Sequence, residues 1–493
     1  MLSTFHKVAL LGAAAALVSC SSTQNPVSGR NELTSVSTAQ ELKIGAEQHP
    51  KILKEFGGVY NERGVGDYVA DLGNRLLANS QVPNQKFTFT VLDDPTVNAF
   101  AVPGGYVYIT RGIMALASDE AEIAGVIGHE IGHIAGRHSA QRRTRQQVAG
   151  LGQLAAVLGA AAAGLDANSA RQLTQASSVA ARGSVSQFSQ KQELEADRLG
   201  VEYLAETGYN PFALSDVLSK MQAQQALSAQ LKGKDYDPNK VGFFSTHPAT
   251  ASRFQQALDT ARASGVPLDN TAPRNPESYM RALDGMIYGD APSEGYVRNN
   301  SFWHPDLGFA FDAPRGWEIK NTDKAVGVMP SGTKNTLAIL TSAKPQGSLE
   351  QVAARTTQKA RIVERPRNST INGFPALTLV TAGKKDGVAL NNRIVLIDAG
   401  DRLYRWQMIA PERQFKQLDH QFEQLAISFR RIDPNGAPPP LRIRTRQVAA
   451  GETVQSLAAQ TGFDNNKEAR FRVLNGFGRG QQPRPGQWVK LVQ

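Results

Sequence analysis

The stretch GVIGHEIGHIAGRH, residues 125–138, constrains the fold of this chain more than any other segment. Its apolar residues recur at helical spacing, and it carries His129 and His133 four positions apart. Side chains at this spacing project from one face of a helix, close enough for both imidazoles to bind one metal ion. The stretch therefore predicts an apolar helix with a candidate metal site, on which Gly128 and Gly132 leave room for a neighbouring element.

Glu130 follows the first of these histidines directly. Because successive helical residues lie about 100° apart around the axis, its carboxylate should lie beside a metal held by the histidines and not bind it. A carboxylate in that place can take a proton from a water molecule that the metal polarises. A catalytic zinc also needs a third protein ligand and an open position, so this helix predicts only part of a site.

The third ligand has two candidates in the sequence. The metzincin pattern places its third histidine one residue further along than His138, which argues against that histidine. The better candidate is Glu193 in QELEADRLG, residues 192–200, which shares a helical face with Asp197. We expect Asp197 to hydrogen-bond the free ring nitrogen of a ligand histidine, and this spacing favours Glu193 over Glu195. A solvated acidic helix face is the alternative.

The N-terminal residues 1–19 have the features of a secretory signal peptide, with Lys7 before an apolar run that is too short to span a bilayer. LVSC, which ends at Cys20, resembles a bacterial lipobox, whose cysteine is lipidated and becomes the mature N-terminus. Cys20 is the one cysteine of the chain, so disulfides cannot stabilise the fold. By the same resemblance, Ser21 directly after the cysteine favours localisation at the outer membrane over retention at the inner membrane. The alternative is an ordinary signal peptide with an incidental cysteine.

The net charge of +10 indicates affinity for an anionic surface, such as lipid head groups or an acidic cell-wall polymer. We expect no nucleic-acid partner, because the sequence has no helix-turn-helix pattern, RNA-binding aromatic pattern or paired-cysteine zinc module. A second apolar run, residues 148–165, is only weakly apolar and is interrupted by Gln153, which favours a buried helix over a membrane span.

Changes of pattern along the chain predict three folded parts. Helical patterns dominate the first, where residues 98–114 add two short strands around a Pro-Gly-Gly turn. Alternating strands with one or two helices form the second, and the third is a small separate unit. The predicted segments are a signal peptide (1–19), a tether (20–35), a first domain (36–264), a linker (265–295), a second domain (296–432), a Pro-rich linker (433–441) and a third domain (442–493).

GHEIGHIAGRHS, ELEADRLG and FFSTHPAT occur in this order along the chain. With their surroundings, about residues 35–262, they resemble the HtpX/CAAX-prenyl-endopeptidase-like zinc peptidases (family M-48), and most closely the bacterial periplasmic lipoprotein members. The resemblance implies a mainly α zincin (gluzincin) domain with a small β-sheet and one Zn²⁺ per chain. It implies His129, His133 and Glu193 as ligands and Glu130 as general base.

The same resemblance implies further site residues. Asn98, Ala99 and Phe100 correspond to an edge strand that pairs with an extended substrate backbone. His247 corresponds to a histidine that reaches the zinc and either holds the site inactive or stabilises the transition state; a histidine that caps a turn is the alternative. Arg253 corresponds to an arginine near the site that binds a carboxylate or an oxyanion, and a surface ion pair is the alternative.

The other two domains resemble known modules. PDLGFAFDAPRGWEI, INGFPALTLV and RLYRWQMIAP resemble PsbP-like α/β domains, which fold around an antiparallel sheet, and Trp317 and Trp406 are expected in the core. RQVAAGETVQSLAAQTG, RVLNGF and PGQWVKLV resemble a LysM-like βααβ module, which implies binding to polymers that contain N-acetylglucosamine, such as peptidoglycan. Basic residues of this module suit an anionic wall polymer, with ordinary surface charge as the alternative, and they are Arg442, Arg444, Arg470, Arg472 and Arg479.

These features predict a multidomain lipoprotein on the periplasmic side of the outer membrane. As a zinc metalloendopeptidase it would cleave unfolded or misassembled envelope proteins. Two alternatives stay open. One is a chaperone or assembly factor for outer-membrane proteins, with a latent protease site held closed by His247. The other is a peptidoglycan-binding lipoprotein with a vestigial peptidase domain, against which the intact ligands and base argue.

Overall fold

The computed structural model describes residues 21–149, 188–233, 235–237, 247, 251–266, 272–322, 324–330, 332–333, 335–358 and 360–493. The predicted signal peptide, Cys20 and most of the apolar run 148–165 lie outside the described residues. The chain divides into two compact units, residues 1–286 together with 442–493, and residues 287–441. Among the described residues, none of the helices is both long and apolar enough to span a bilayer.

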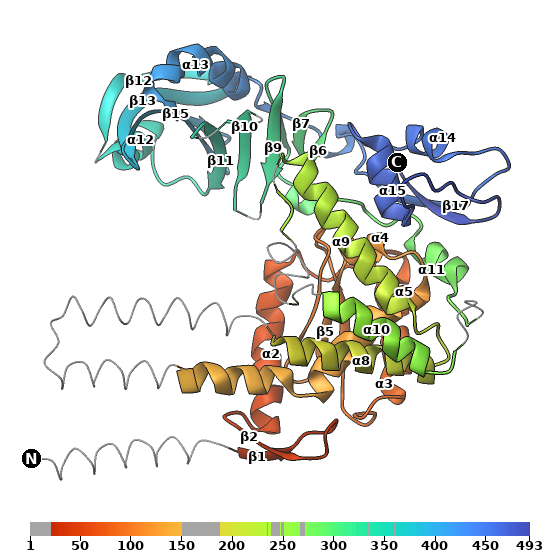
Figure 1. Cartoon of the computed structure of the whole chain (residues 1–493). Helices are drawn as coiled ribbons and strands as arrows, with labels where there is room; N and C mark the ends of the chain where they lie inside the picture. Colours follow the sequence, from red (N-terminus) through yellow and green to blue (C-terminus); the bar gives the residue numbers. More distant parts are fainter. Residues whose placement is uncertain are drawn as a thin grey trace, which may run out of the picture. The chain divides into compact units, whose positions relative to one another are not determined.

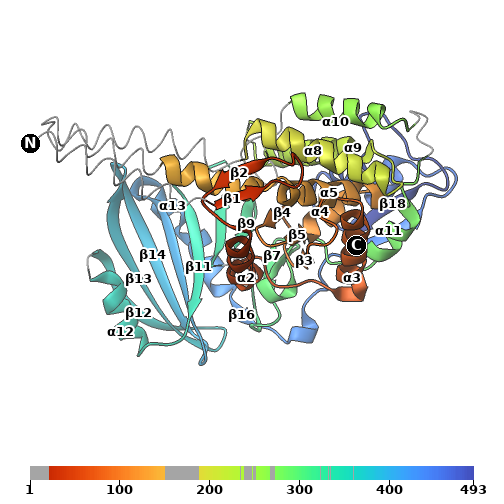
Figure 2. The same cartoon turned by 90° about the horizontal axis from the view of Figure 1, so that it is seen from below.

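Helices build most of the first unit (Figure 1). They are α2 (Thr38–Glu55), α3 (Val65–Ala78), α4 (Arg111–Leu116), α5 (Glu120–Ala135), α8 (Gln190–Glu206), α9 (Ala213–Leu231), α10 (Ala251–Ala263) and α11 (Pro276–Leu283). Its strands include β1 (Ser21–Gln24), β2 (Asn31–Thr34), β3 (Thr88–Leu92), β4 (Ala99–Val102) and β5 (Tyr106–Thr110). Helix α5 lies between the small sheet, which it contacts at β4 and β5, and the helices α8 and α9, against which α10 also packs (Figure 2).

The sequence of α5 accounts for its central place. Asp119 caps the helix by accepting a hydrogen bond from the backbone N–H of Glu122 at 2.9 Å, and Glu120 adds negative charge at the positive end of the helix. Every residue of α5 except Ile134 is buried. The predicted apolar helix is therefore a core element with neighbours on all sides, and its two histidines are in the interior.

Residues 98–114 form the predicted pair of short strands, β4 and β5, which are antiparallel. Gly104 and Gly105 in the turn between them have φ values of 89° and 88°, in the left-handed region that favours glycine. Strand β5 also pairs in parallel with β3, so the order is β3-β5-β4 and β4 is an edge strand. The structure thus confirms an edge strand at this point of the sequence.

The C-terminal segment folds in the predicted order of strand, helix, helix and strand. These elements are β17 (Ile443–Gln447), α14 (Val454–Ala459), α15 (Lys467–Asn475) and β18 (Trp488–Val492). The sequence predicts a separate unit here, whereas the structure includes residues 442–493 in the first compact unit. The segment is thus integrated with the helical part of the chain, and its boundary at residue 442 as a separate domain stays a prediction.

A buried lysine is a physical reason for this integration. Lys490 is fully buried, and its Nζ donates to the carbonyl oxygens of Ala115 (2.7 Å), Leu116 (3.1 Å) and Ala117 (2.6 Å) at the end of α4. Burial lowers the pKa of Lys490 well below its usual range. A polar group buried this deeply is tolerated only with its hydrogen bonds satisfied, so the lysine ties β18 to the segment that leads into α5.

The α-helices and strands of the second unit are β6 (Tyr296–Arg298), β7 (Ser301–His304), β8 (Phe309–Asp312), β9 (Trp317–Asn321), β10 (Val326–Pro330), β11 (Leu337–Ala343), α12 (Leu349–Thr357), β12 (Arg361–Ile371), β13 (Phe374–Lys385), β14 (Val388–Asp398), β15 (Leu403–Pro411), α13 (Glu412–Ile427) and β16 (Arg430–Arg431). An antiparallel sheet of seven strands, in the order β12-β13-β14-β15-β11-β10-β9, forms most of this unit. Helices cover both of its faces. Leu377 of β13 shares a core cluster with Ala353 of α12, whereas Val380 of the same strand shares another with Phe422 of α13. The alternation of side chains along a strand places these two clusters on opposite faces. A four-stranded sheet in the order β16-β8-β7-β6 completes the unit.

Trp317 and Trp406 are buried in the core of this second unit, as predicted. The chain is thus built of several parts that combine helices with several sheets, as expected from the sequence.

The role of Lys490 is testable by Lys490→Met, which keeps the length of the side chain and removes the donor shared by three carbonyl groups. We expect the free energy of unfolding of the first unit to fall by about 2 kcal/mol, measured by denaturant unfolding of the whole chain. Lys232→Met, at an exposed position, is the control and should change it by less than about 0.5 kcal/mol. Equal stability of the two variants would show that Lys490 does not fasten the segment.

Candidate metal centre

Helices α5 and α8 approach each other closely because small residues line their contact. A methyl group at Gly128 would lie 3.2 Å from Cα of Gly200, and one at Gly132 would lie 3.3 Å from Cα of Ala196. Both distances are tighter than ordinary packing, so a larger residue at either position would push the helices apart. The prediction that these two glycines admit a close neighbour is confirmed, and the neighbour is the acidic helix α8.

Four side chains meet where these helices touch, namely His129 and His133 of α5, Glu193 of α8, and His247. One donor atom from each lies within 4.8 Å of the other three, and all four side chains are buried. His129 Nε2 is 3.0 Å from His133 Nε2 and 3.3 Å from His247 Nδ1. Glu193 Oε1 is 3.5 Å from His133 Nε2 and 3.1 Å from His247 Nδ1. The structure thus brings together four residues predicted as ligands or as close to the metal.

The donor separations fit a metal ion. Tetrahedral ligands at about 2.0–2.2 Å from a zinc ion are about 3.3–3.6 Å from one another, and the measured distances lie around this range. The donors are three imidazole nitrogens and one carboxylate oxygen, which is a set that transition metals prefer. Lone pairs this close repel one another unless a cation or a proton lies between them. The group is therefore a candidate metal centre.

Burial controls the charges of this group. It lowers the pKa of His129, and it lowers the pKa values of His133 and His247 well below their usual range, which keeps the imidazoles neutral. Burial also raises the pKa of Glu193 to about 7. For Glu130, whose Oε1 is 3.7 Å from His247 Nε2, burial and the nearby Glu193 raise the pKa well above its usual range. A cation between these groups would favour the carboxylates and the neutral imidazoles together.

Asp197 and Arg253 support the donors from behind. Asp197 Oδ1 is 2.8 Å from Nδ1 of His129, as predicted from the spacing on α8. Arg253 donates to both oxygens of Asp197 at 2.7 Å, lies 3.0 Å from Glu193 Oε2 and donates to the carbonyl oxygen of His247 at 3.1 Å. Burial opposes ionisation of Asp197, but Arg253 holds the pKa of this carboxyl well below its usual range. Arg253 is 1% exposed, so it does not form the surface ion pair considered as an alternative.

The edge strand β4 runs beside Glu130. The carbonyl oxygen of Asn98 accepts a hydrogen bond from β5, and antiparallel alternation then turns Phe100 toward β5 as well. The same alternation points the backbone groups of Ala99 and Ala101 away from β5, and the backbone of Ala101 faces the Glu130 carboxylate. The side of β4 that faces away from β5 therefore lies next to this carboxylate, and Ala99 is fully buried there.

The sequence did not predict the contacts that Phe188, His138 and Glu195 make at the metal centre. The ring of Phe188 stacks on that of His133 with centroids 4.1 Å apart. His138 Nδ1 is 2.8 Å from His133 Nδ1, and its Nε2 is 3.1 Å from Glu195 Oε2. His138 is outside the four-donor group, in agreement with the argument against the metzincin pattern, yet it contacts a donor. Helical periodicity ends at the turn after α5, so it could not predict the contact between His138 and His133. The only indication in the sequence was that His138 belongs to the same motif.

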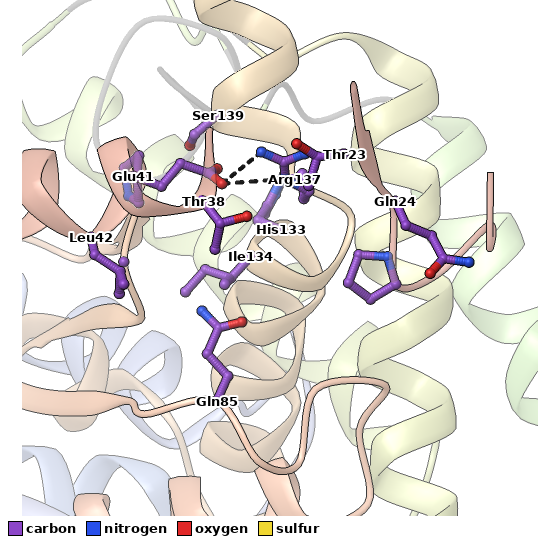
Figure 3. A pocket seen from close by; sticks show the side chains of 13 residues that line it. Thr23, Gln24, Thr38, Glu41, Leu42, Gln85, His133, Ile134, Arg137 and Ser139 are labelled. Atoms are coloured by element: carbon purple, nitrogen blue, oxygen red, sulfur yellow. Dashed lines mark hydrogen bonds and ion pairs between the residues drawn. The ribbon is translucent and has the colours of Figure 1, made fainter. Parts of the chain in front are cut away.

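A pocket opens next to His133 (Figure 3). Its lining comes from the N-terminal hairpin, helix α2, the turn after β4 and the end of α5. The ion pair between Glu41 and Arg137, with a 2.8 Å distance from oxygen to nitrogen, forms part of the wall. None of the other three donors lines the pocket, so it adjoins the metal centre only through His133.

Comparison with known proteins places the centre in a family. The family model described as Peptidase family M48 matches residues 66–261, which include all four donors and Glu130. Metalloprotease LoiP of Escherichia coli (strain K12) is 34% identical over 195 residues, which cover 40% of this chain and 68% of LoiP. The chain belongs to peptidase family M48. The resemblance inferred from three short motifs is thus confirmed.

Other relatives of this M48 chain match the same part of it. Beta-barrel assembly-enhancing protease of Escherichia coli (strain K12) is 28% identical over 243 residues, or 48% of this chain and 47% of that protein. Mitochondrial metalloendopeptidase OMA1 of Schizosaccharomyces pombe is 28% identical over 233 residues, or 47% of this chain and 64% of OMA1. The chain thus spans about half the length of the beta-barrel assembly-enhancing proteases that it matches.

One solved structure resembles part of the chain only weakly. The solution structure of cyanobacterial PsbP from Synechocystis aligns with 29% of this chain and 96% of that one, at 14% identity and a TM-score of 0.23. A TM-score this low carries no argument about the fold. The PsbP-like character of the second unit stays a prediction from its sequence.

Proposed function

We propose that this M48 chain is a zinc-dependent metalloendopeptidase of the bacterial cell envelope. One observation carries the proposal, the buried group of four metal-binding donors with the Glu130 carboxylate beside it. The neighbouring edge strand β4 supports a polypeptide substrate, because an edge strand can pair with an extended chain. Membership of a peptidase family supports the same reaction class.

We assign one Zn²⁺ to His129, His133 and Glu193, with His247 as the fourth donor in this structure. Three imidazoles and a single carboxylate favour zinc over calcium or magnesium, which prefer oxygen ligands. When bound, zinc polarises a carbonyl group and lowers the pKa of a water molecule. Asp197 orients His129 through the 2.8 Å contact at Nδ1, which directs the other ring nitrogen at the metal.

Glu130 is the general base in this proposal. Its raised pKa makes its carboxylate a stronger base than an exposed glutamate, which suits the removal of a proton from the attacking water. The same side chain then delivers the proton to the leaving amine. The substrate pairs with the edge of β4 as an added strand, so that its scissile bond lies beside this carboxylate. Arg253 keeps Asp197 ionised and, 3.0 Å from Glu193, opposes the rise in the pKa of that carboxyl that burial causes.

Glu130→Gln tests the base, because it keeps the shape of the side chain and removes its proton affinity. We expect the variant to bind zinc as the wild type does and to lose cleavage of casein by about 10²–10⁴-fold. Zinc is measured by elemental analysis and cleavage by peptide release. Glu202→Gln, on the outer part of α8 and paired with Arg198, is the matched control and should cleave normally. Full activity of Glu130→Gln would contradict the mechanism.

His247 supports a closed resting state. Its Nδ1 lies 3.1 Å from Glu193 and 3.3 Å from His129, in a place where an open zinc site needs a free position. We therefore infer that His247 holds the site latent in this arrangement and must move for substrate to bind. This favours a regulated protease with an assembly role over one that cleaves constantly.

His247→Ala tests the latch. We expect zinc to be retained by the other three ligands and casein cleavage to increase several-fold, because the fourth position is opened. His420→Ala, at an exposed position of α13, is the matched control and should leave cleavage unchanged. Unchanged or reduced cleavage in His247→Ala would argue against a latch and for a contribution of His247 to catalysis.

The proposal of a peptidoglycan-binding lipoprotein with a vestigial peptidase domain has less support. A complete donor group and base do not suggest decay. Arg442 lies 2.8 Å from Glu62, and Arg472 lies 2.8 Å from Glu468, so these two cations serve ion pairs within the first unit. Binding of the LysM-like module to glycan, and of the PsbP-like unit to substrates as an adaptor, stay predictions of the sequence.

We propose further that the chain is lipid-anchored at Cys20 on the periplasmic side of the outer membrane, and that it cleaves unfolded or misassembled envelope proteins. The lipobox-like LVSC supports the anchor. The name of the similar beta-barrel assembly-enhancing protease supports substrates among outer-membrane proteins.

Cys20→Ser tests the anchor, because serine cannot accept the thioether-linked lipid. In a Gram-negative host we expect the wild type in the outer-membrane fraction and the variant in the soluble periplasm or retained as an unprocessed precursor. Fractionation with immunoblotting distinguishes these locations. Wild-type protein that is released as readily as a soluble periplasmic marker would contradict the proposed location.

A further inference from the structure

We propose that His138, backed by Glu195, is a positioning residue for His133 and determines which ring nitrogen of His133 faces the metal. The inference rests on the proposed metal site. Its basis is a row of three side chains that is separate from the four donors. His133 Nδ1 lies 2.8 Å from His138 Nδ1, and His138 Nε2 lies 3.1 Å from Glu195 Oε2.

The chemistry of imidazole gives this row one direction. Two ring nitrogens 2.8 Å apart need one N–H donor and one acceptor. His133 Nε2 faces the other donors, so a bound metal takes the lone pair on Nε2 and the proton of the neutral ring is on Nδ1. His133 then donates to His138, and the remaining N–H of His138 donates to Glu195. Only with the hydrogen bonds in this direction does every polar atom of His133, His138 and Glu195 in the row have a partner.

The two ligand histidines of α5 therefore have different partners. His129 meets the buried carboxylate of Asp197 directly, at 2.8 Å. His133 meets the ring of His138, and the carboxylate comes one side chain later, where Glu195 is 31% exposed. Partners of this kind orient a ligand and change its metal affinity. We expect His133 to depend on His138 as His129 depends on Asp197.

The conformation of the turn after α5 places the side chain of His138 against that of His133. Arg137, between them, has a left-handed φ of 52°, which is uncommon for a residue other than glycine. Its guanidinium is fixed by Glu41 at 2.8 Å. Gly136 leaves the space for the ring, because a methyl group there would lie 2.5 Å from His138 Nε2. The backbone and the neighbouring residue thus both accommodate this one side chain, which is fully buried.

Two substitutions of His138 separate hydrogen bonding from space filling. The whole chain is loaded with zinc for competition against a chelator, and with Co²⁺ for its absorption spectrum. We expect His138→Leu, which fills space without an acceptor, to raise the zinc dissociation constant by about 10–100-fold and to shift the Co²⁺ bands. His138→Asn, whose amide oxygen can accept from His133 Nδ1, should restore most of the affinity and the wild-type spectrum.

Gly136→Ala gives an independent test. The backbone of Gly136, with φ −74° and ψ −2°, is one that alanine adopts, and the three atoms nearest to the added methyl group all belong to the ring of His138. We expect this variant to lose zinc affinity as His138→Leu does. In the double variant Gly136→Ala/His138→Ala the ring is gone, so its affinity should equal that of His138→Ala alone. Additive losses would contradict a shared mechanism.

Glu195→Gln keeps an acceptor for His138 and removes only the charge, so we expect a loss in zinc affinity below about ten-fold. The matched controls are Glu202→Gln on the same helix and His420→Leu in the second unit, and both should bind zinc as the wild type does. Folded His138→Leu with wild-type affinity and an unchanged Co²⁺ spectrum would overturn the inference. Wild-type protein that binds no zinc would instead overturn the proposed metal site.

Discussion

The contact between helices α5 and α8 is the constraint on which the rest of the centre depends. At Gly128, Gly132 and Gly200 the two helices come close together, so their histidine and carboxylate faces meet directly. Donor atoms about 3 Å apart follow from that approach, since a methyl-sized separation would move Glu193 out of reach of both histidines. The glycines lower the stability of the helices, but they allow the close approach that metal binding needs.

Close packing also creates an electrostatic problem, because it buries several ionisable groups together. An unpaired charge in such a place costs several kcal/mol, and the structure avoids this by pairing. Arg253 joins Asp197, Glu193 and the backbone of His247 in one network. Behind the other histidine of α5, His138 and Glu195 form a second row of hydrogen bonds. A cation among the four donors would complete this balance of charges, so metal binding and folding of the centre are expected to be coupled.

Much of this arrangement is predictable because it repeats at helical spacing. His129, Glu130 and His133 lie within one helical turn, and Glu193 and Asp197 lie within another, so each face follows from local geometry. Contacts across turns and between distant segments cannot be predicted from the helical or strand periodicity of the sequence. The left-handed Arg137 redirects the chain before His138, and Lys490 reaches α4 from the other end of the chain. Sequence reasoning accordingly rejected His138 as a ligand without finding its contact with His133, and treated the C-terminal segment as a separate unit.

The sequence by itself determined the family, the two helices that carry the ligands, the edge strand beside them and the order of elements in the C-terminal segment. Each of these depends on the spacing of residues close to one another in the chain. The sequence left an alternative open for His247 and for Arg253, and only the tertiary structure decided that His247 joins the donors and that Arg253 is buried against Asp197. It alone also decided that residues 442–493 pack in the first unit. These outcomes depend on which surfaces can be buried together with their polar groups satisfied, and that is a property of the packed chain.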